Sequence, residues 1–120
     1  MTKEKKLFWI AAAKKELLAL SEELKDAFGH ALNDVQQGET PSNAKAMKGK
    51  LRDVVEIIED EDGDTFRTMY TVKMEGVVYV LGSFKKKSKS GIATPKQDLD
   101  RILTRLKTAR QHYKHLRSDT

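Results

Sequence analysis

The central part of the chain constrains the fold most, because three apolar runs are separated there by very short turns. The runs span residues 54–59, 65–74 and 77–84, and the turns contain Asp62-Gly63 and Glu75-Gly76. Asp-Gly is a strong signal for a two-residue hairpin turn. Strands joined by such short turns must be antiparallel. The segment therefore predicts an antiparallel unit of three strands, and the continuously apolar third run is expected inside the sheet.

Helices are predicted on both sides of this unit. Residues 7–10 form a short apolar run that is typical of a strand, and residues 11–37 then predict either two helices or one bent helix. Ser21 has the side chain of an N-cap residue, and Gly38 is a typical helix stop. Residues 39–50 show no periodicity and are predicted to form a loop.

The last helix is the clearest local prediction. Thr94 is the expected N-cap, Pro95 the first helical residue, and Gln97 completes a capping box. The apolar residues that follow form one stripe, with the arginines on the opposite face: Leu99, Ile102, Leu103, Leu106, Ala109, Tyr113 and Leu116.

These elements predict a single α+β domain over residues 1–120. Its twisted, antiparallel-dominated sheet of about four strands carries two N-terminal helices and a C-terminal helix, in the order β-α-α-β-β-β-α. A chain of 120 residues has the usual length of one domain. We expect the helices to cover one face of the sheet, leaving the other open and concave for a ligand.

The charges indicate an anionic partner. The formal net charge is +5, and the positive residues gather in residues 45–52, in residues 85–89 and along the final helix. Four lysines within residues 85–89 repel one another, so folding alone does not explain them. Held at a strand end, they would form a phosphate site, which points to nucleic acid first.

Several other functions find little support in the sequence. There are no cysteines, no apolar run of membrane-spanning length and no signal peptide, so we expect a cytoplasmic protein. His112 and His115 lack a nearby carboxylate and are interpreted as exposed helix residues. The acidic residues 59–64 do not match a calcium loop. No metal site, cofactor, nucleotide-binding loop or serine nucleophile is predicted.

Arg67 is the central candidate for chemistry. It lies in the middle of a predicted strand, where a cross-strand acid such as Glu56 can pair with it. Arginine suits the developing charge of a phosphorane, and a lysine beside it can transfer a proton near neutral pH. Together they could cleave RNA through attack of its own 2′-hydroxyl, without a metal. Simple nucleic-acid binding remains open on the same residues.

Several motifs in this order and spacing resemble the RelE/ParE superfamily of bacterial type II toxins, in its HigB-like, phage-derived branch. They are Gly-Glu-x-Pro-x-x-Ala-Lys-x-x-Lys-Gly at residues 38–49, Val-Glu-Ile at 55–57, Asp-Gly-Asp-Thr-Phe-Arg-x-x-Tyr at 62–70, Tyr-Val-Leu at 79–81, Phe-Lys-Lys-Lys-Ser at 84–88 and Thr-Pro at 94–95. The resemblance covers nearly the whole chain.

The resemblance implies a ribosome-dependent mRNA endonuclease that is neutralised by a helix-turn-helix, HigA-like antitoxin. Arg67 matches the strand arginine that contacts the scissile phosphate, and Lys86 and Lys87 match basic residues that serve in catalysis. RNA-binding positions are implied at Lys48, Lys85, Lys89, Glu56 and Tyr70. The helices 11–37 and the C-terminal helix are both candidate antitoxin contacts, and acidic antitoxin side chains would occlude the lysine block. Substituting Arg67 by Ala is expected to abolish growth arrest without unfolding the protein, because an exposed strand arginine contributes little to stability.

One departure from the family leaves alternatives open. Many relatives carry a catalytic Tyr or His near the C-terminal end of the sheet, where this chain has lysines and serines, so no general base is assigned. ParE-like members act on gyrase and not on RNA. The alternatives are thus a gyrase-binding toxin and a non-enzymatic, nucleic-acid-binding accessory protein of phage origin.

Overall fold

The computed structural model describes residues 4–86 and 95–118 and confirms the α+β class. The elements follow in the order β1 (Lys6–Trp9), α1 (Ala13–Leu18), α2 (Glu22–Gln36), β2 (Ala44–Ala46), the 3-10 turn η1 (Gly49–Leu51), β3 (Val55–Glu61), β4 (Asp64–Thr71), β5 (Val77–Lys86) and α3 (Lys96–Ser118). Within these described ranges, no helix is long and apolar enough to span a membrane.

The five strands form one sheet in the order β1-β5-β4-β3-β2. β1 runs parallel to β5, and the other neighbouring pairs are antiparallel. For β3, β4 and β5 the short turns predicted this arrangement. The expectation of about four strands missed β2, which lies within the predicted loop 39–50. β2 is only Ala-Lys-Ala, with Lys45 paired to Glu56, and three residues are too few for an apolar–polar alternation to indicate a strand.

The hairpin between β3 and β4 has the predicted turn. Asp62 and Gly63 have φ angles of 52° and 83°, both in the left-handed region that a type I′ turn requires. Glu61 pairs with Asp64 directly across the turn. This turn fixes the register of β3 against β4, and with it the relative positions of Glu56 and Arg67.

The N-terminal helical region divides into two helices at Ser21. The Ser21 Oγ accepts a hydrogen bond from the Leu24 N–H at 3.2 Å, which confirms the predicted N-cap of α2. The helix ends before Gly38, whose φ of 89° turns the chain so that the Glu39 N–H donates to the Asp34 carbonyl at 2.9 Å. The buried side of α2 packs on one face of the sheet through Leu24, Phe28, Ala31, Leu32 and Val35.

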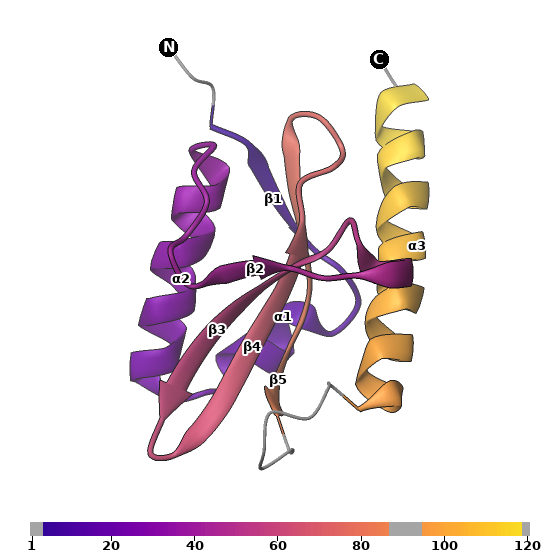
Figure 1. The fold of residues 1–120 in the computed structure, drawn as a ribbon. Coiled ribbons are helices and arrows are strands. Elements are labelled where there is room, and N and C mark those ends of the chain that lie inside the picture. Colours follow the sequence, from indigo (N-terminus) through magenta and orange to yellow (C-terminus); the bar gives the residue numbers. More distant parts are fainter. Residues whose placement is uncertain (1–3, 87–94, 119–120) are drawn as a thin grey trace.

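α3 lies across the other face of the sheet, so the two long helices flank it on opposite sides (Figure 1). The predicted apolar stripe of α3 packs there against Tyr79 and Leu81 of β5 and Met69 of β4. The predicted cap residue Thr94 lies outside the described residues. The first hydrogen bond of the helical pattern is donated by the Leu99 N–H to the Pro95 carbonyl at 3.1 Å. The expectation that one whole face stays open is therefore wrong, because the apolar stripe of α3 needs a sheet surface to bury.

Arg105 corrects the prediction that the α3 arginines share the outer face. Its guanidinium donates to both Glu16 oxygens, at 2.7 and 2.9 Å, and to the Leu81 carbonyl at 2.9 Å. Glu16 also accepts from the Ser83 N–H at 3.2 Å. β5 has an extra residue at Leu81, where its register against β4 shifts. The network thus joins α1, the β5 bulge and α3, and it fixes the strand that leads to Lys85 and Lys86.

Candidate functional site

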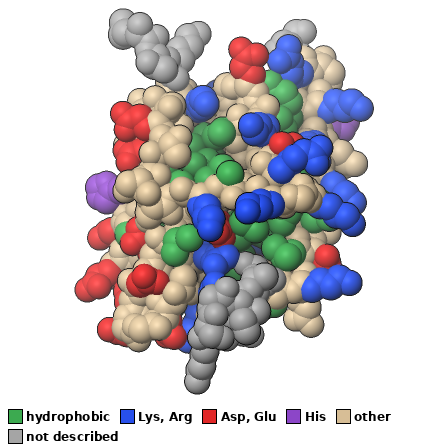
Figure 2. Space-filling model, in the orientation of Figure 1, with side chains coloured by type: hydrophobic (Ala, Val, Ile, Leu, Met, Phe, Trp, Pro, Cys, Tyr) green, Lys and Arg blue, Asp and Glu red, His purple; other side chains and the backbone are tan. Residues whose placement is uncertain are grey.

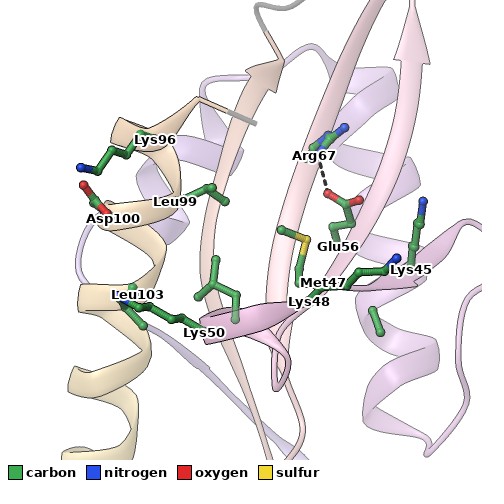
Figure 3. Close-up of a pocket in the computed structure, with 12 residues that line it drawn as sticks. Lys45, Met47, Lys48, Lys50, Glu56, Arg67, Lys96, Leu99, Asp100 and Leu103 are labelled. Carbon is green, nitrogen blue, oxygen red and sulfur yellow. Dashed lines mark hydrogen bonds and ion pairs between the residues drawn. The ribbon is translucent and has the colours of Figure 1, made fainter. Parts of the chain in front are cut away.

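A pocket of about 560 Å³ opens on the part of the sheet that α3 leaves uncovered (Figure 3). One wall comes from β2 and η1, the opposite wall from the N-terminal half of α3, and the floor from β3 and β4. The lining residues are Lys45, Ala46, Met47, Lys48, Lys50, Leu51, Glu56, Arg67, Lys96, Leu99, Asp100 and Leu103. The volume is within the range of small-molecule sites, roughly 300–1,000 Å³.

Arg67 and Glu56 lie together at the floor of this pocket. The Arg67 Nη1 donates to the Glu56 Oε2 at 2.7 Å, which confirms the predicted cross-strand pair (Figure 3). Both side chains are about nine-tenths buried, at 10% and 7% exposure. The expectation of an exposed strand arginine is therefore wrong. α3 and the β2–η1 segment rise on either side of β4 and enclose this position.

Four lysines surround the pocket and make its rim basic. Lys45 and Lys48 come from β2 and the start of η1, Lys50 from η1, and Lys96 from the first turn of α3. All four are exposed. In Figure 2, Lys and Arg side chains gather near the centre of this face and along its right side, over α3, whereas acidic side chains lie along the left side. The predicted RNA-binding residue Lys48 is thus part of a larger cationic rim.

The lysine block after β5 does not act as one unit, because β5 extends through its first two residues. Lys86 pairs with Thr65 and Phe84 with Arg67, so strand alternation places Lys86 on the face of Arg67. Lys85 pairs with Phe66 on the opposite face, and its Nζ lies 3.1 Å from Asp64. The structure therefore separates Lys85 from the pocket face.

The two remaining lysines predicted in this block, Lys87 and Lys89, lie outside the described residues.

Tyr70 does not lie on or beside the pocket face, contrary to the expectation for an RNA-binding residue. It is 2% exposed and packs under α2 with Phe28 and Val80. Phe66 of the same strand and Val72, just beyond its end, pack on the same core cluster, as the strand periodicity predicted. Burial raises the pKa of the Tyr70 phenol above its ordinary value. Tyr70 therefore belongs to the core.

Sequence reasoning missed the apolar walls of the pocket. Met47 and Leu51 come from the β2–η1 segment, and Leu99 and Leu103 from α3. The two leucines belong to the predicted apolar stripe, and nothing in the stripe indicates that its N-terminal end also faces a pocket. Met47 is the one large aliphatic residue in the predicted loop 39–50, and the sequence gives no other signal for its role.

The other titratable candidates lie apart from the pocket. Within residues 4–86 and 95–118, no group of three His, Asp or Glu side chains is placed to hold a metal ion. The His112 Nδ1 lies 2.7 Å from the Tyr79 hydroxyl, and its ring packs on Phe8. This predicted surface histidine thus contacts the core through one ring edge.

The pocket combines the features of an anion site with those of an apolar slot. Its rim attracts phosphate, and its floor carries a guanidinium whose planar fork suits phosphate oxygens. The same floor carries the Glu56 carboxylate, which is a proton acceptor next to the guanidinium. A cation that stabilises charge on phosphate oxygens and a carboxylate that accepts a proton are two of the groups that can support cleavage of a phosphodiester bond without a metal.

Comparisons with known proteins agree with this fold. The family model described as phage derived protein Gp49-like matches residues 15–107. A mutant of the Escherichia coli toxin RelE, solved in the free state, matches with a TM-score of 0.55 and 21% identity over 70% of this chain and 85% of that chain. The RelBE2 toxin–antitoxin complex from Mycobacterium tuberculosis matches with a TM-score of 0.51 and 17% identity over 73% of this chain and 98% of that chain.

No curated protein matches the sequence. The two structural matches show the RelE fold, and the family model spans most of the chain, from α1 to the middle of α3. These matches do not distinguish the HigB-like branch from other proteins with this fold. The chain belongs to the family of phage-derived, Gp49-like proteins and has the fold of the RelE toxins.

Proposed function

We propose that the protein is the toxin of a type II toxin–antitoxin system and that it cleaves mRNA on the ribosome. The observation that carries this proposal is the buried Arg67–Glu56 pair at the floor of a lysine-rimmed pocket. The RelE fold and the sequence resemblance described above support the same activity.

The proposed reaction is attack of a 2′-hydroxyl on the adjacent phosphate. The new bond joins the 2′-oxygen to phosphorus and the bond to the 5′-oxygen breaks, which leaves a 2′,3′-cyclic phosphate and a 5′-hydroxyl. Arg67 stabilises the charge that develops on the phosphoryl oxygens. In this proposal Glu56 accepts the proton of the 2′-hydroxyl, and Lys86 donates a proton to the leaving 5′-oxygen.

The rim lysines have a separate role in this proposal. Lys48 and the other rim cations attract the message and hold its backbone, because each neutralised phosphate releases a counterion. In this proposal they contact the backbone of the message and not the reacting atoms, so their loss is expected to weaken binding more than chemistry. Lys85, which pairs with Asp64 on the far face, is not part of this machinery.

A helix-turn-helix, HigA-like antitoxin is the proposed partner, since one of the similar structures is a toxin–antitoxin complex. The basic rim favours acidic antitoxin side chains, which would block the pocket directly. Action on ribosomes also places the proposed activity in the cytoplasm. An antitoxin complex that leaves the rim lysines exposed contradicts direct blocking.

Expression from a tightly controlled promoter tests the activity in cells. We expect wild-type protein to arrest growth and to produce new message 5′ ends inside coding regions. Lys86→Ala is expected to lose these ends, and the neighbouring Lys85→Ala, on the opposite face, is the matched control that keeps them. Growth arrest with intact message and an SOS response identifies a gyrase-directed toxin instead. Salt-sensitive RNA binding without toxicity identifies an accessory protein.

A further inference from the structure

The pocket is larger and more apolar than a phosphate clamp needs. A phosphate site requires only donors and positive charge, yet half of the α3 wall is hydrocarbon, from Leu99 and Leu103, and Met47 faces it from the other side (Figure 3). These side chains are only partly buried. Their exposed surfaces line the pocket next to the Arg67–Glu56 pair, so a ligand that reaches the floor also contacts them.

The charges give the pocket a direction. Arg67 on β4, Lys48 at the start of η1 and Lys45 on β2 carry positive charge, whereas on the α3 side the charge of Lys96 is opposed by the carboxylate of Asp100. A bound nucleotide therefore places its phosphate toward the arginine and its uncharged, flat part toward α3. Base-binding pockets of nucleic-acid enzymes hold an unstacked base between aromatic or apolar side chains, which contact its flat face.

The geometry points to a nucleobase slot formed by Met47, Leu99 and Leu103, which holds one unstacked base of single-stranded RNA beside the phosphate at Arg67. This inference rests on the proposed function and specifies its substrate as single-stranded nucleic acid with at least one extruded base. The slot makes the base, and not only the backbone, part of the recognition.

A 2′-deoxy trinucleotide tests the slot without any cleavage, because it lacks the attacking hydroxyl. Its partner probe is the abasic trinucleotide, which has the same phosphates and sugars. We expect the abasic probe to bind wild-type protein about tenfold more weakly, which corresponds to the loss of roughly 55 Å² of apolar contact. The difference is expected to shrink in Leu103→Ala. Leu116→Ala is the matched control, since Leu116 is a partly buried leucine of the same helix and cluster, away from the pocket.

Methionine methyl NMR locates the base independently of affinity. The ring current of a base in the slot shifts the Met47 methyl signal with the trinucleotide, and the abasic probe leaves it nearly unmoved. Met74, which lines a separate surface groove with Tyr113 and Arg117, is the internal control. Equal affinity for both probes, a shift at Met74 in place of Met47, or no binding at millimolar concentration overturns the inference. A Met47 shift that an acidic, apolar peptide produces and the trinucleotide does not also overturns the inference.

The two proposals fail separately in these experiments. Base-dependent binding at Met47 without any message cleavage on ribosomes rejects the nuclease and keeps the slot. Message cleavage with base-independent binding rejects the slot and keeps the nuclease.

Discussion

The Arg67–Glu56 pair leads to a prediction that separates its structural contribution from its chemistry. At an N–O distance of 2.7 Å and an effective dielectric constant near 20, the attraction between the two charges is about 6 kcal/mol. Desolvation of both groups offsets much of it, so replacing the pair by apolar residues is often nearly neutral. Removing one partner leaves the other charge buried, which costs about 3–5 kcal/mol. We therefore expect Arg67→Leu alone to destabilise the fold by about 3 kcal/mol.

A double-mutant cycle with Glu56→Leu measures this coupling. Each single variant is expected to unfold at a lower urea concentration, by about 1–2 M for a slope near 2 kcal/mol/M. The double variant is expected to recover most of the loss, with a coupling energy of at least about 2 kcal/mol, while remaining inactive. Fluorescence of Trp9, the single tryptophan, follows unfolding. Single variants as stable as wild type, or a coupling energy near zero, refute the reasoning.

Three further predictions follow from individual contacts. Lys86→Ala is expected to reduce the yield of message 5′ ends at least about tenfold more than Lys85→Ala, because Lys86 shares the face of Arg67 and Lys85 does not. Equal losses in the two variants contradict this placement. Ser21→Ala is expected to lower the free energy of unfolding by about 1 kcal/mol in urea titrations, since it removes the α2 N-cap, and an unchanged midpoint would show that the cap contributes nothing.

The third concerns the Tyr70 phenol, because burial raises its pKa above the ordinary value of 10.0. Its contribution to stability is therefore complete below the pKa of the unfolded chain and is lost as the pH rises toward the pKa of the folded protein. Tyr70→Phe is expected to lose less stability than wild type between pH 9 and 11 in thermal melts, and parallel losses would argue against this origin.

Much of the fold could be predicted from local patterns. The Asp62-Gly63 turn, the Ser21 cap and the apolar stripe of α3 depend on contacts close in sequence, and the structure confirms them. β2 could not be found in this way, because its three residues become a strand only through pairing with β3. Likewise, Arg105 leaves the outer face of α3 because Glu16, far away in sequence, lies within its reach.

The sequence predicted the part of the site that depends on strand pairing, but it did not predict which face of the sheet each side chain occupies. The register that the turn determines pairs Arg67 with Ile58 and places Glu56 two residues further along β3, within diagonal reach of Arg67 on the same face. The separation of Lys85 from Lys86 follows from the length of β5, which the sequence-based prediction ended at residue 84. Tyr70 was assigned to RNA by resemblance, although its own strand periodicity places it with Phe66 in the core. The periodicity was the better guide.

The most direct test of the central claim is a reconstituted translation reaction in which message 5′ ends are mapped with and without ribosomes. Arg67→Ala does not serve as the only negative control, since it leaves Glu56 buried without its partner. Arg67→Lys keeps a positive charge beside Glu56, and the Arg67→Leu/Glu56→Leu double variant keeps the fold. We predict ribosome-dependent cuts by wild-type protein and none by either folded variant. Intact message with wild-type protein, or undiminished cleavage by the double variant, contradicts the account.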